Sequence, residues 1–168
     1  MLTAEQVITE LKLIPHPDEG GFYKETYRST EIIDKEALPI RYMSERAYST
    51  CIYYLLTPTT FSHIHRLQSA EIFHFYLGDP CEMIQLYPDG KGKLITLGQD
   101  VLNEQQVQVV VDKHTWQGMK LKKGGEFALL GTTVAPSFEF QDYEHGKRAS
   151  LLEKYPDFEE QIISLTKE

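Results

Sequence analysis

The sequence is poor in cysteine, in basic residues and in long apolar runs, and each shortage excludes a class of protein. Its two cysteines, Cys51 and Cys81, lie in separate apolar segments, so both are expected to be reduced, buried side chains, and no Cys-x-x-Cys pair exists for a thiolate zinc site. Only 17 Lys and Arg stand against 25 Asp and Glu, for a formal charge of -8. Without clustered basic residues, the chain is not expected to bind nucleic acid.

No stretch approaches the ~20 apolar residues of a membrane span. The first residues also lack the charged and then apolar design of a secretory signal. We therefore expect a cytoplasmic protein with no membrane partner. The length suits a single domain over residues 1–168, and the 41% hydrophobic and 11% aromatic content indicates a soluble globular chain rich in strand formers.

Residues 61–78 carry the most informative pattern of the chain. His63 and His65 are two positions apart in a strand-like segment. Residues i and i+2 of a strand point to the same face, so the two imidazoles are predicted to converge on one point in space. Such a pair is typical of a metal site or of an acid/base site.

Glu71 begins the next predicted strand, over residues 71–77, which Gly78 ends. It shares its parity with Phe73, Phe75 and Leu77, and these apolar side chains suit the lining of a barrel. Because side chains of one parity face one side of a strand, Glu71 is predicted to point inward beside the two histidines.

The rest of the chain is predicted to be mainly β. Short segments at a spacing of roughly 8–12 residues, separated by Gly, Pro and Asp turns, are typical of an all-β sandwich or barrel. A capping-box pattern predicts a helix over 4–12, the tail 146–168 predicts two short helices broken at Pro156, and the polar segment 31–47 predicts a long loop at a pocket mouth. Further strands are expected at 49–56, 82–87, 93–97, 106–111, 115–121 and 126–134.

The segment 19–29 also predicts a strand, and it contains charges. Alternation places Tyr23 and Glu25 on one face and Arg28 on the other. Either Glu25 or Arg28 therefore points inward, and a charge that faces a barrel interior is a candidate ligand contact.

With these residues in place, the chain resembles the cupin superfamily of small β-barrels. The first half of the cupin motif matches His63, His65, Glu71 and Gly78, with one additional residue before the glutamate, and the position of the third histidine falls on Gln117. The chain is most similar to a small branch, cupin family 5, which is a domain of unknown function. The segments that carry this similarity are 16–23, 53–58, 74–80, 116–118 and 134–140.

The resemblance implies a double-stranded β-helix, or jelly-roll, barrel with a small-molecule pocket, and a homodimer. It also implies a ligand set for a divalent metal such as Zn, Ni, Mn or Fe, formed by His63, His65, Glu71 and Gln117, in which the neutral amide oxygen of glutamine is the weakest donor.

Without a metal, the same cluster suits general acid/base catalysis. A histidine that a carboxylate orients can remove a proton next to a carbonyl, while a tyrosine hydroxyl returns one. Tyr23, Tyr53 and Glu25 are candidate partners, and Trp116, next to Gln117, is either a core side chain or a stacking surface for a ligand.

Sugar-nucleotide epimerases on similar barrels make an isomerase or epimerase that acts on a sugar-like or other small polar metabolite the leading hypothesis. A non-catalytic binding or sensor protein and a metal-dependent oxygenase are the alternatives. Outside this cluster, His16, His114 and His145 are expected in turns, His74 in a hydrogen bond or a subunit contact, and Glu139 in solvent.

Overall fold

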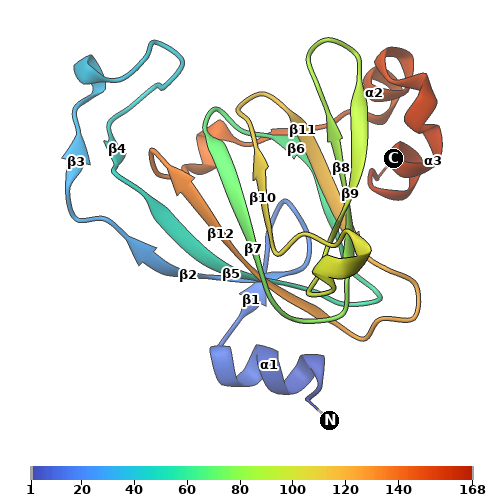
Figure 1. Ribbon diagram of the computed structural model, residues 1–168. Helices are drawn as coiled ribbons and strands as arrows, with labels where there is room; N and C mark the ends of the chain where they lie inside the picture. Colours follow the sequence, from blue (N-terminus) through green and yellow to red (C-terminus); the bar gives the residue numbers. More distant parts are fainter. Residues whose placement is uncertain (1, 168) are drawn as a thin grey trace.

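The computed structural model describes residues 2–167 and shows two antiparallel sheets that enclose a common interior (Figure 1). One sheet has the order β1 (Ile14–Pro15), β2 (Phe22–Arg28), β5 (Thr50–Leu56), β12 (Ala128–Ala135), β7 (Ala70–Gly78) and β10 (Gln108–Val111). The other has the order β13 (Glu144–His145), β6 (Phe61–Arg66), β11 (Trp116–Leu121), β8 (Cys81–Leu86) and β9 (Gly92–Leu97). From β5 to β13, successive strands therefore alternate between the two sheets, except for the hairpin of β8 and β9, as in the predicted jelly roll.

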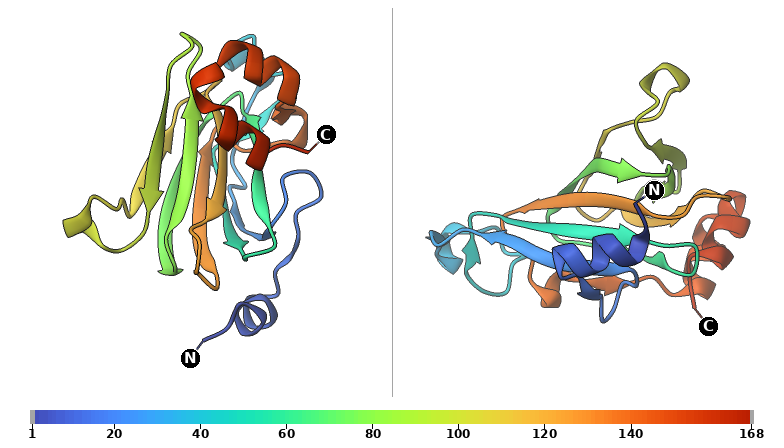
Figure 2. Two further views of the ribbon diagram at one scale, coloured as in Figure 1. Left: turned by 90° about the vertical axis from the view of Figure 1, so that its right-hand side faces the viewer. Right: turned by 90° about the horizontal axis from the view of Figure 1, so that it is seen from below.

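Three α-helices flank the sheets (Figure 2). Helix α1 (Ala4–Leu11) begins at the predicted capping box and packs against the outer side of the first sheet, where Phe127 and Leu129 are buried with Val7. Helices α2 (Arg148–Lys154) and α3 (Glu159–Ser164), with the 3-10 turn η4 (Pro156–Phe158) between them, cover the second sheet, as predicted. Within residues 2–167, no helix is long and apolar enough to cross a membrane.

The interior between the sheets is divided into an apolar part and a polar part. The apolar part is one continuous cluster in which Leu56, Met83 and Leu130 are at most 1% exposed. Phe73 and Phe75 belong to it, as their parity predicts, whereas Leu77 packs with the α1 cluster instead. The register of β7 against β12 shifts by one residue before Leu77, so its side chain turns to the outer face.

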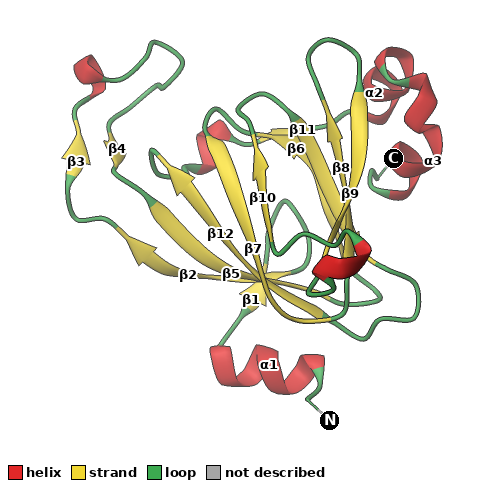
Figure 3. Cartoon of the chain, viewed as in Figure 1, coloured by secondary structure: helices red, strands yellow, loops and turns green. Residues whose placement is uncertain are grey.

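Residues 31–47 are not the unstructured loop that the sequence predicts. They form the short hairpin β3 (Ile32–Ile33) and β4 (Arg46–Ala47) and the turn η1 (Lys35–Ala37), which extend from one end of the barrel (Figure 3). The guanidinium of Arg46 is fully buried and lies 2.7 Å from Asp142, in the 3-10 turn η3 (Phe140–Asp142). This ion pair ties the base of the hairpin to the barrel.

One further 3-10 turn, η2 (Val101–Asn103), lies in the connection between β9 and β10. The predicted turn at residues 88–90 joins β8 to β9, and Gly90 supplies the positive φ of 90° that the turn requires. Cys51 and Cys81 are both free thiols, as expected.

Candidate functional site

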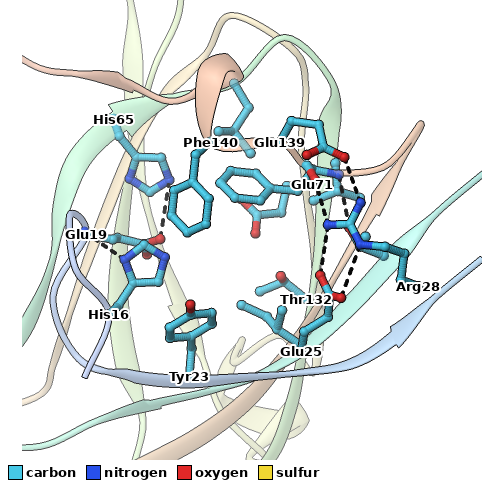
Figure 4. A pocket seen from close by; sticks show the side chains of 15 residues that line it. His16, Glu19, Tyr23, Glu25, Arg28, His65, Glu71, Thr132, Glu139 and Phe140 are labelled. Carbon is cyan, nitrogen blue, oxygen red and sulfur yellow. Dashed lines mark hydrogen bonds and ion pairs between the residues drawn. The ribbon is translucent and has the colours of Figure 1, made fainter. Parts of the chain in front are cut away.

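A cavity of about 280 Å³ occupies the polar part of the interior (Figure 4). The first sheet supplies most of its wall, β6 supplies one histidine, and the three segments that follow β1, β6 and β12 complete it. The lining residues are His16, Glu19, Tyr23, Glu25, Arg28, Thr50, Ile52, His65, Leu67, Glu71, Thr132, Val134, Phe138, Glu139 and Phe140. None of the described residues of the hairpin segment 31–47 is among them, so that segment does not line the mouth.

His65 is 1% exposed and its imidazole is held in one orientation. Its Nδ1 lies 2.7 Å from the carbonyl oxygen of His63, a geometry that places the ring proton on Nδ1. Burial lowers the pKa of His65, so the ring is neutral near pH 7. Nε2 is then an unprotonated acceptor on the side where Glu19 lies, 3.9 Å away. This atom has the properties of a general base.

Glu71 is also buried, at 7% exposure, and it accepts a hydrogen bond of 2.7 Å from Nε2 of Gln117. The same amide nitrogen lies 3.4 Å from Nε2 of His65, so Gln117 joins the carboxyl to the imidazole. Burial, followed by the charge of Glu19, raises the pKa of Glu71 to about 7. Glu71 can therefore hold or release a proton near neutral pH.

Glu19 is the second carboxyl group of this cluster. Its Oε1 accepts a hydrogen bond of 2.5 Å from the hydroxyl of Ser62, and burial raises its pKa. Tyr54 fixes the loop that carries Glu19, because its hydroxyl donates to the carbonyl oxygen of Gly20 at 2.8 Å. Glu19 and Glu71 repel each other when both are ionised. One of them therefore keeps its proton to a higher pH than it would alone.

His16 complements His65. Its Nδ1 accepts hydrogen bonds from the backbone N–H groups of Glu19, at 2.9 Å, and Asp18, at 3.3 Å. Burial lowers the pKa of His16, so the neutral ring carries its proton on Nε2, which points into the cavity (Figure 4). His16 thus offers a donor where His65 offers an acceptor.

The mouth of the cavity carries a group of three charges. Arg28 binds Glu25 through Nε and NH2, at 3.1 and 2.9 Å, and it binds Glu139 through NH1 at 2.7 Å. A further bond of 3.2 Å runs to the carbonyl oxygen of Phe138. The guanidinium therefore joins β2 to the segment that follows β12.

His63 does not join His65 in the cavity, so the prediction that the two imidazoles converge is wrong. The register between β6 and β11 shifts: Gln117 pairs with His65, while Met119 pairs with Ser62. Three residues of β6 thus span two of β11, which is a β-bulge, and the bulge breaks the alternation on which the prediction depended. His65 and Ser62 face the interior, and His63 between them does not line the cavity.

His63 instead packs beside the aromatic rings of Phe61 and His145, with ring centroids 4.6 and 5.0 Å away. It is 2% exposed, and burial lowers its pKa to about 4. Its Nδ1 is buried without a hydrogen-bond partner among the described residues. His145 lies in the short strand β13 and not in a turn as expected.

A second bulge explains why Glu25 and Arg28 both line the cavity, although the alternation allows only one of them. Glu25 pairs with Ile52 of β5 and Tyr27 with its neighbour Cys51, so β2 contains one additional residue. After this bulge Arg28 faces the same side as Glu25. Tyr23 also lines the cavity, as predicted.

Tyr53 and Trp116 lie outside the cavity. Tyr53 is on the outer face of its sheet, where its ring lies edge-on to Tyr76 with centroids 6.1 Å apart. Trp116 packs against the α2 and α3 cluster and carries the guanidinium of Arg66 at 4.4 Å from its ring. Trp116 is therefore a core side chain and not a stacking surface of this cavity.

The predicted metal ligands do not fit a metal site. His63 does not line the cavity, and the amide nitrogen of Gln117, not its oxygen, lies toward Glu71 and His65. Among residues 2–167, no group of three or more His, Cys, Asp and Glu side chains is arranged to hold a metal ion. His65, Gln117 and Glu71 instead form a hydrogen-bonded acid/base cluster.

Sequence analysis missed several lining residues, namely His16, Glu19, Thr132, Phe138, Glu139 and Phe140. His16 was expected in a turn, and Glu139 was expected in solvent. The signal that points to His16 and Glu19 is the segment 16–23, which carried part of the family resemblance but was assigned no chemical role. Its loop geometry, with positive φ at Gly20 and Gly21, folds both side chains inward.

A family model described as cupin superfamily (DUF985) matches residues 5–146. An uncharacterized protein of Saccharomyces cerevisiae is 32% identical over 148 residues, covering 83% of this chain and 73% of the yeast protein. A solved structure from Shewanella oneidensis has a TM-score of 0.87 at 31% identity, covering 99% of each chain. A hypothetical protein from Leishmania major has a TM-score of 0.88 at 31% identity, covering 99% of this chain and 100% of that one.

A more distant likeness shows the fold alone. Oxalate decarboxylase from Bacillus subtilis has a TM-score of 0.54 at 11% identity, covering 92% of this chain and 37% of that one. The jelly-roll architecture is therefore shared across proteins that have little sequence in common.

Proposed function

Because this chain belongs to the cupin superfamily, in the branch described as DUF985, we propose that its cavity binds a small polar metabolite and isomerises it by acid/base chemistry. The observation that carries this proposal is the pairing of an unprotonated Nε2 on His65 with a carboxyl group, Glu71, whose pKa lies near 7. Gln117 bridges the two groups. A base and an acid in one buried cavity are what a proton shuttle requires.

In the proposed reaction, His65 takes the proton from a carbon next to a carbonyl group. The electron pair moves toward the carbonyl oxygen, which receives the proton of Glu71, so an enediol forms. Glu71 then takes the proton of the hydroxyl on the carbon that was deprotonated, which becomes the new carbonyl group. His65 returns its proton to the former carbonyl carbon. Both groups regain their starting states, and the N–H of His16 stabilises the oxygen that gains charge.

The test is proton exchange and turnover in heavy water with a panel of small aldoses and ketoses. The wild-type protein is expected to exchange the hydrogen next to the carbonyl of its substrate, as followed by NMR. The variant His65→Gln should lose about 10²–10⁴ in rate, the usual contribution of general acid/base catalysis. The control His114→Asn removes an imidazole outside the cavity, at a positive φ that Asn tolerates, and should leave the rate unchanged.

A non-catalytic binding protein is the second candidate, since the same cavity would hold a ligand without turning it over. Binding in the absence of any exchange would decide for this alternative. The metal-dependent oxygenase of the sequence analysis receives no support, because its predicted ligands do not converge.

We also propose that the chain forms a homodimer through the outer face of its first sheet. This face exposes apolar side chains on three strands: Tyr27 is 53% exposed, Tyr76 44% and Val110 51%. Tyr76 and Val110 lie on the neighbouring strands β7 and β10, and exposed apolar side chains on one sheet face are typical of an interface. Val110→Lys should shift the mass measured by light scattering from that of a dimer to that of a monomer. The control Ile40→Lys, on the hairpin segment, should leave the dimer intact. A monomeric wild-type protein would contradict the proposed dimer.

A further inference from the structure

We infer that the cavity selects a small metabolite that carries a protonated amine, and that it rejects anions such as carboxylates and phosphates. This inference rests on the proposed small-molecule function and names the charge of the ligand. It follows from three features of the cavity. Its one guanidinium is already paired with carboxylates, its wall has more hydrogen-bond acceptors than donors, and part of that wall is aromatic.

Arg28 is the only cationic side chain among the lining residues, apart from the two histidines. A guanidinium has five N–H donors. Four of these donors are already used, two by Glu25, one by Glu139 and one by the carbonyl oxygen of Phe138. A carboxylate or phosphate that bound Arg28 through two hydrogen bonds would have to displace one of these partners, so Arg28 does not provide a free anion site.

Acceptors outnumber donors on the rest of the wall. Four carboxyl groups, from Glu19, Glu25, Glu71 and Glu139, face one guanidinium across the same cavity. Burial raises the pKa of Glu19 and Glu71, but Glu71, with a pKa of about 7, is largely ionised at pH 7.5, and Glu25 and Glu139 alone outnumber Arg28. The two histidines do not offset this excess, because burial keeps them neutral. An ammonium group, with three donors and a positive charge, complements such a wall, whereas an anion would be repelled by it.

An aromatic wall completes the site. Tyr23 lies opposite Phe140 across the open centre of the cavity (Figure 4). Phe138 and Phe140 also line the cavity, and their rings stand edge-to-face to each other, with centroids 5.2 Å apart and planes at 75°. Ring faces next to carboxylates attract cations, as in the aromatic cages that bind alkylammonium groups.

The volume limits the size of the ligand. The cavity of about 280 Å³ is slightly smaller than the range of roughly 300–1,000 Å³ that is usual for ligand pockets. A nucleoside diphosphate sugar would therefore exceed the cavity, and its phosphates would meet the carboxylates. The structure favours an amino sugar or a compound of similar size over a sugar nucleotide.

Matched probes test the charge selectivity. D-glucosamine, D-glucose and D-gluconate, and the smaller set ethanolamine, ethylene glycol and glycolate, are titrated at pH 7.5 and constant ionic strength by thermal shift and calorimetry. We expect an amine of at least one set to bind with a Kd about tenfold below that of its neutral counterpart, the size of a cation–π and ionic contribution. Its anionic counterpart should cause no shift.

Two charge-neutralising variants and a control locate the effect. Glu139→Gln and Glu25→Gln should each raise the Kd of the amine about threefold, as expected for a half-exposed charge. Glu153→Gln, on the exposed side of α2, should leave it unchanged. Val134→Phe, which fills the cavity, should abolish binding of every probe.

The outcomes separate the charge inference from the proposed function. Binding of glucose or gluconate as tight as that of glucosamine, and lost in Val134→Phe, would overturn the charge inference and leave the small-molecule function standing. If no probe of any charge binds at up to about 50 mM, the charge inference falls, and the proton-exchange test with aldoses and ketoses decides the proposed function separately.

Discussion

The barrel interior has two halves, built from the same strands, that differ in almost every physical property. Strand β12 contributes Leu130 to the apolar half and Thr132 to the polar half, and β11 likewise contributes Met119 to one and Gln117 to the other. The apolar half is packed tightly, whereas the polar half encloses a cavity. A change of two residues along a strand therefore separates a core that stabilises the fold from a site that does not.

The two halves also differ in their contribution to the free energy of folding. Burying an aliphatic side chain stabilises a protein by about 1.5–3 kcal/mol, whereas a buried polar group without a partner destabilises it. In the polar half, Oε1 of Gln117 is buried without a partner among the described residues, and Glu71 and His65 are kept from water. A group of residues retained at such a cost is typical of a functional site.

The largest expected effect contrasts the two halves on one strand. Leu130 is fully buried in the apolar cluster, so Leu130→Ala should lower the free energy of unfolding by about 2–5 kcal/mol through the cavity it leaves. Thr132→Val, two residues along β12, removes a hydroxyl and little volume, and should cost about 1 kcal/mol. Urea denaturation measures both, and equal losses would show that the two halves contribute alike.

The second prediction concerns pH and isolates Glu71. Its pKa is raised from 4.5 to about 7 in the folded protein. The folded state therefore binds a proton that the unfolded chain releases in this window, so this contribution to stability is fully present below pH 4.5 and is lost as the pH rises through 7. At 1.36 kcal/mol per unit, it amounts to about 3 kcal/mol.

Glu71→Gln removes this titration and keeps the hydrogen bond to Gln117. The variant should gain stability relative to the wild-type protein as the pH rises from 4 to 8, because it does not pay for ionising a buried carboxyl group. The gain should be at most about 3 kcal/mol, since part of the raised pKa of Glu71 comes from its repulsion with Glu19. The lowered pKa values of His16 and His65 act in the opposite direction, costing stability as the pH falls. The variant also lacks the charge of Glu71, which raises the pKa of His65, so this cost is larger in the variant at low pH and adds to the expected difference. A difference that does not vary with pH would contradict the raised pKa.

Much of the fold follows from the sequence, because alternation, turn residues and the capping box are local signals. The parity of Phe73, Phe75 and Leu77 predicts an inward Glu71, and Glu71 does line the cavity, although Leu77 itself turns outward after a register shift. The alternation failed at two single-residue bulges. His63 lies within one of them, and the other lets Glu25 and Arg28 both face inward where alternation allows only one, since one extra residue reverses the side chains that follow it. The register of a partner strand decides where a bulge forms, and a local pattern does not contain that register.

The two histidines of β6 give a third, smaller contrast. His63 lies outside the cavity with a buried Nδ1 that lacks a partner, so His63→Leu exchanges an unsatisfied polar ring for an apolar side chain. Its stability should change by less than about 1 kcal/mol, and the Kd for a cavity ligand should stay the same. His65→Gln, in contrast, should weaken ligand binding. Calorimetry with glucosamine distinguishes the two variants. An equal loss of glucosamine affinity in both would show that His63 takes part in ligand binding.

The smallest effect on stability is expected at the mouth. Arg28, Glu25 and Glu139 have side chains that are 38%, 42% and 36% exposed, so their ion pairs should contribute less than about 1 kcal/mol. Arg28→Gln leaves the carboxylates without their cation, and binding of glucosamine should therefore tighten by about threefold although a charged contact is lost. Weaker binding of glucosamine in this variant, or gluconate binding by the wild-type protein that Arg28→Gln abolishes, would show that Arg28 contacts the ligand directly and that the cavity accepts anions after all.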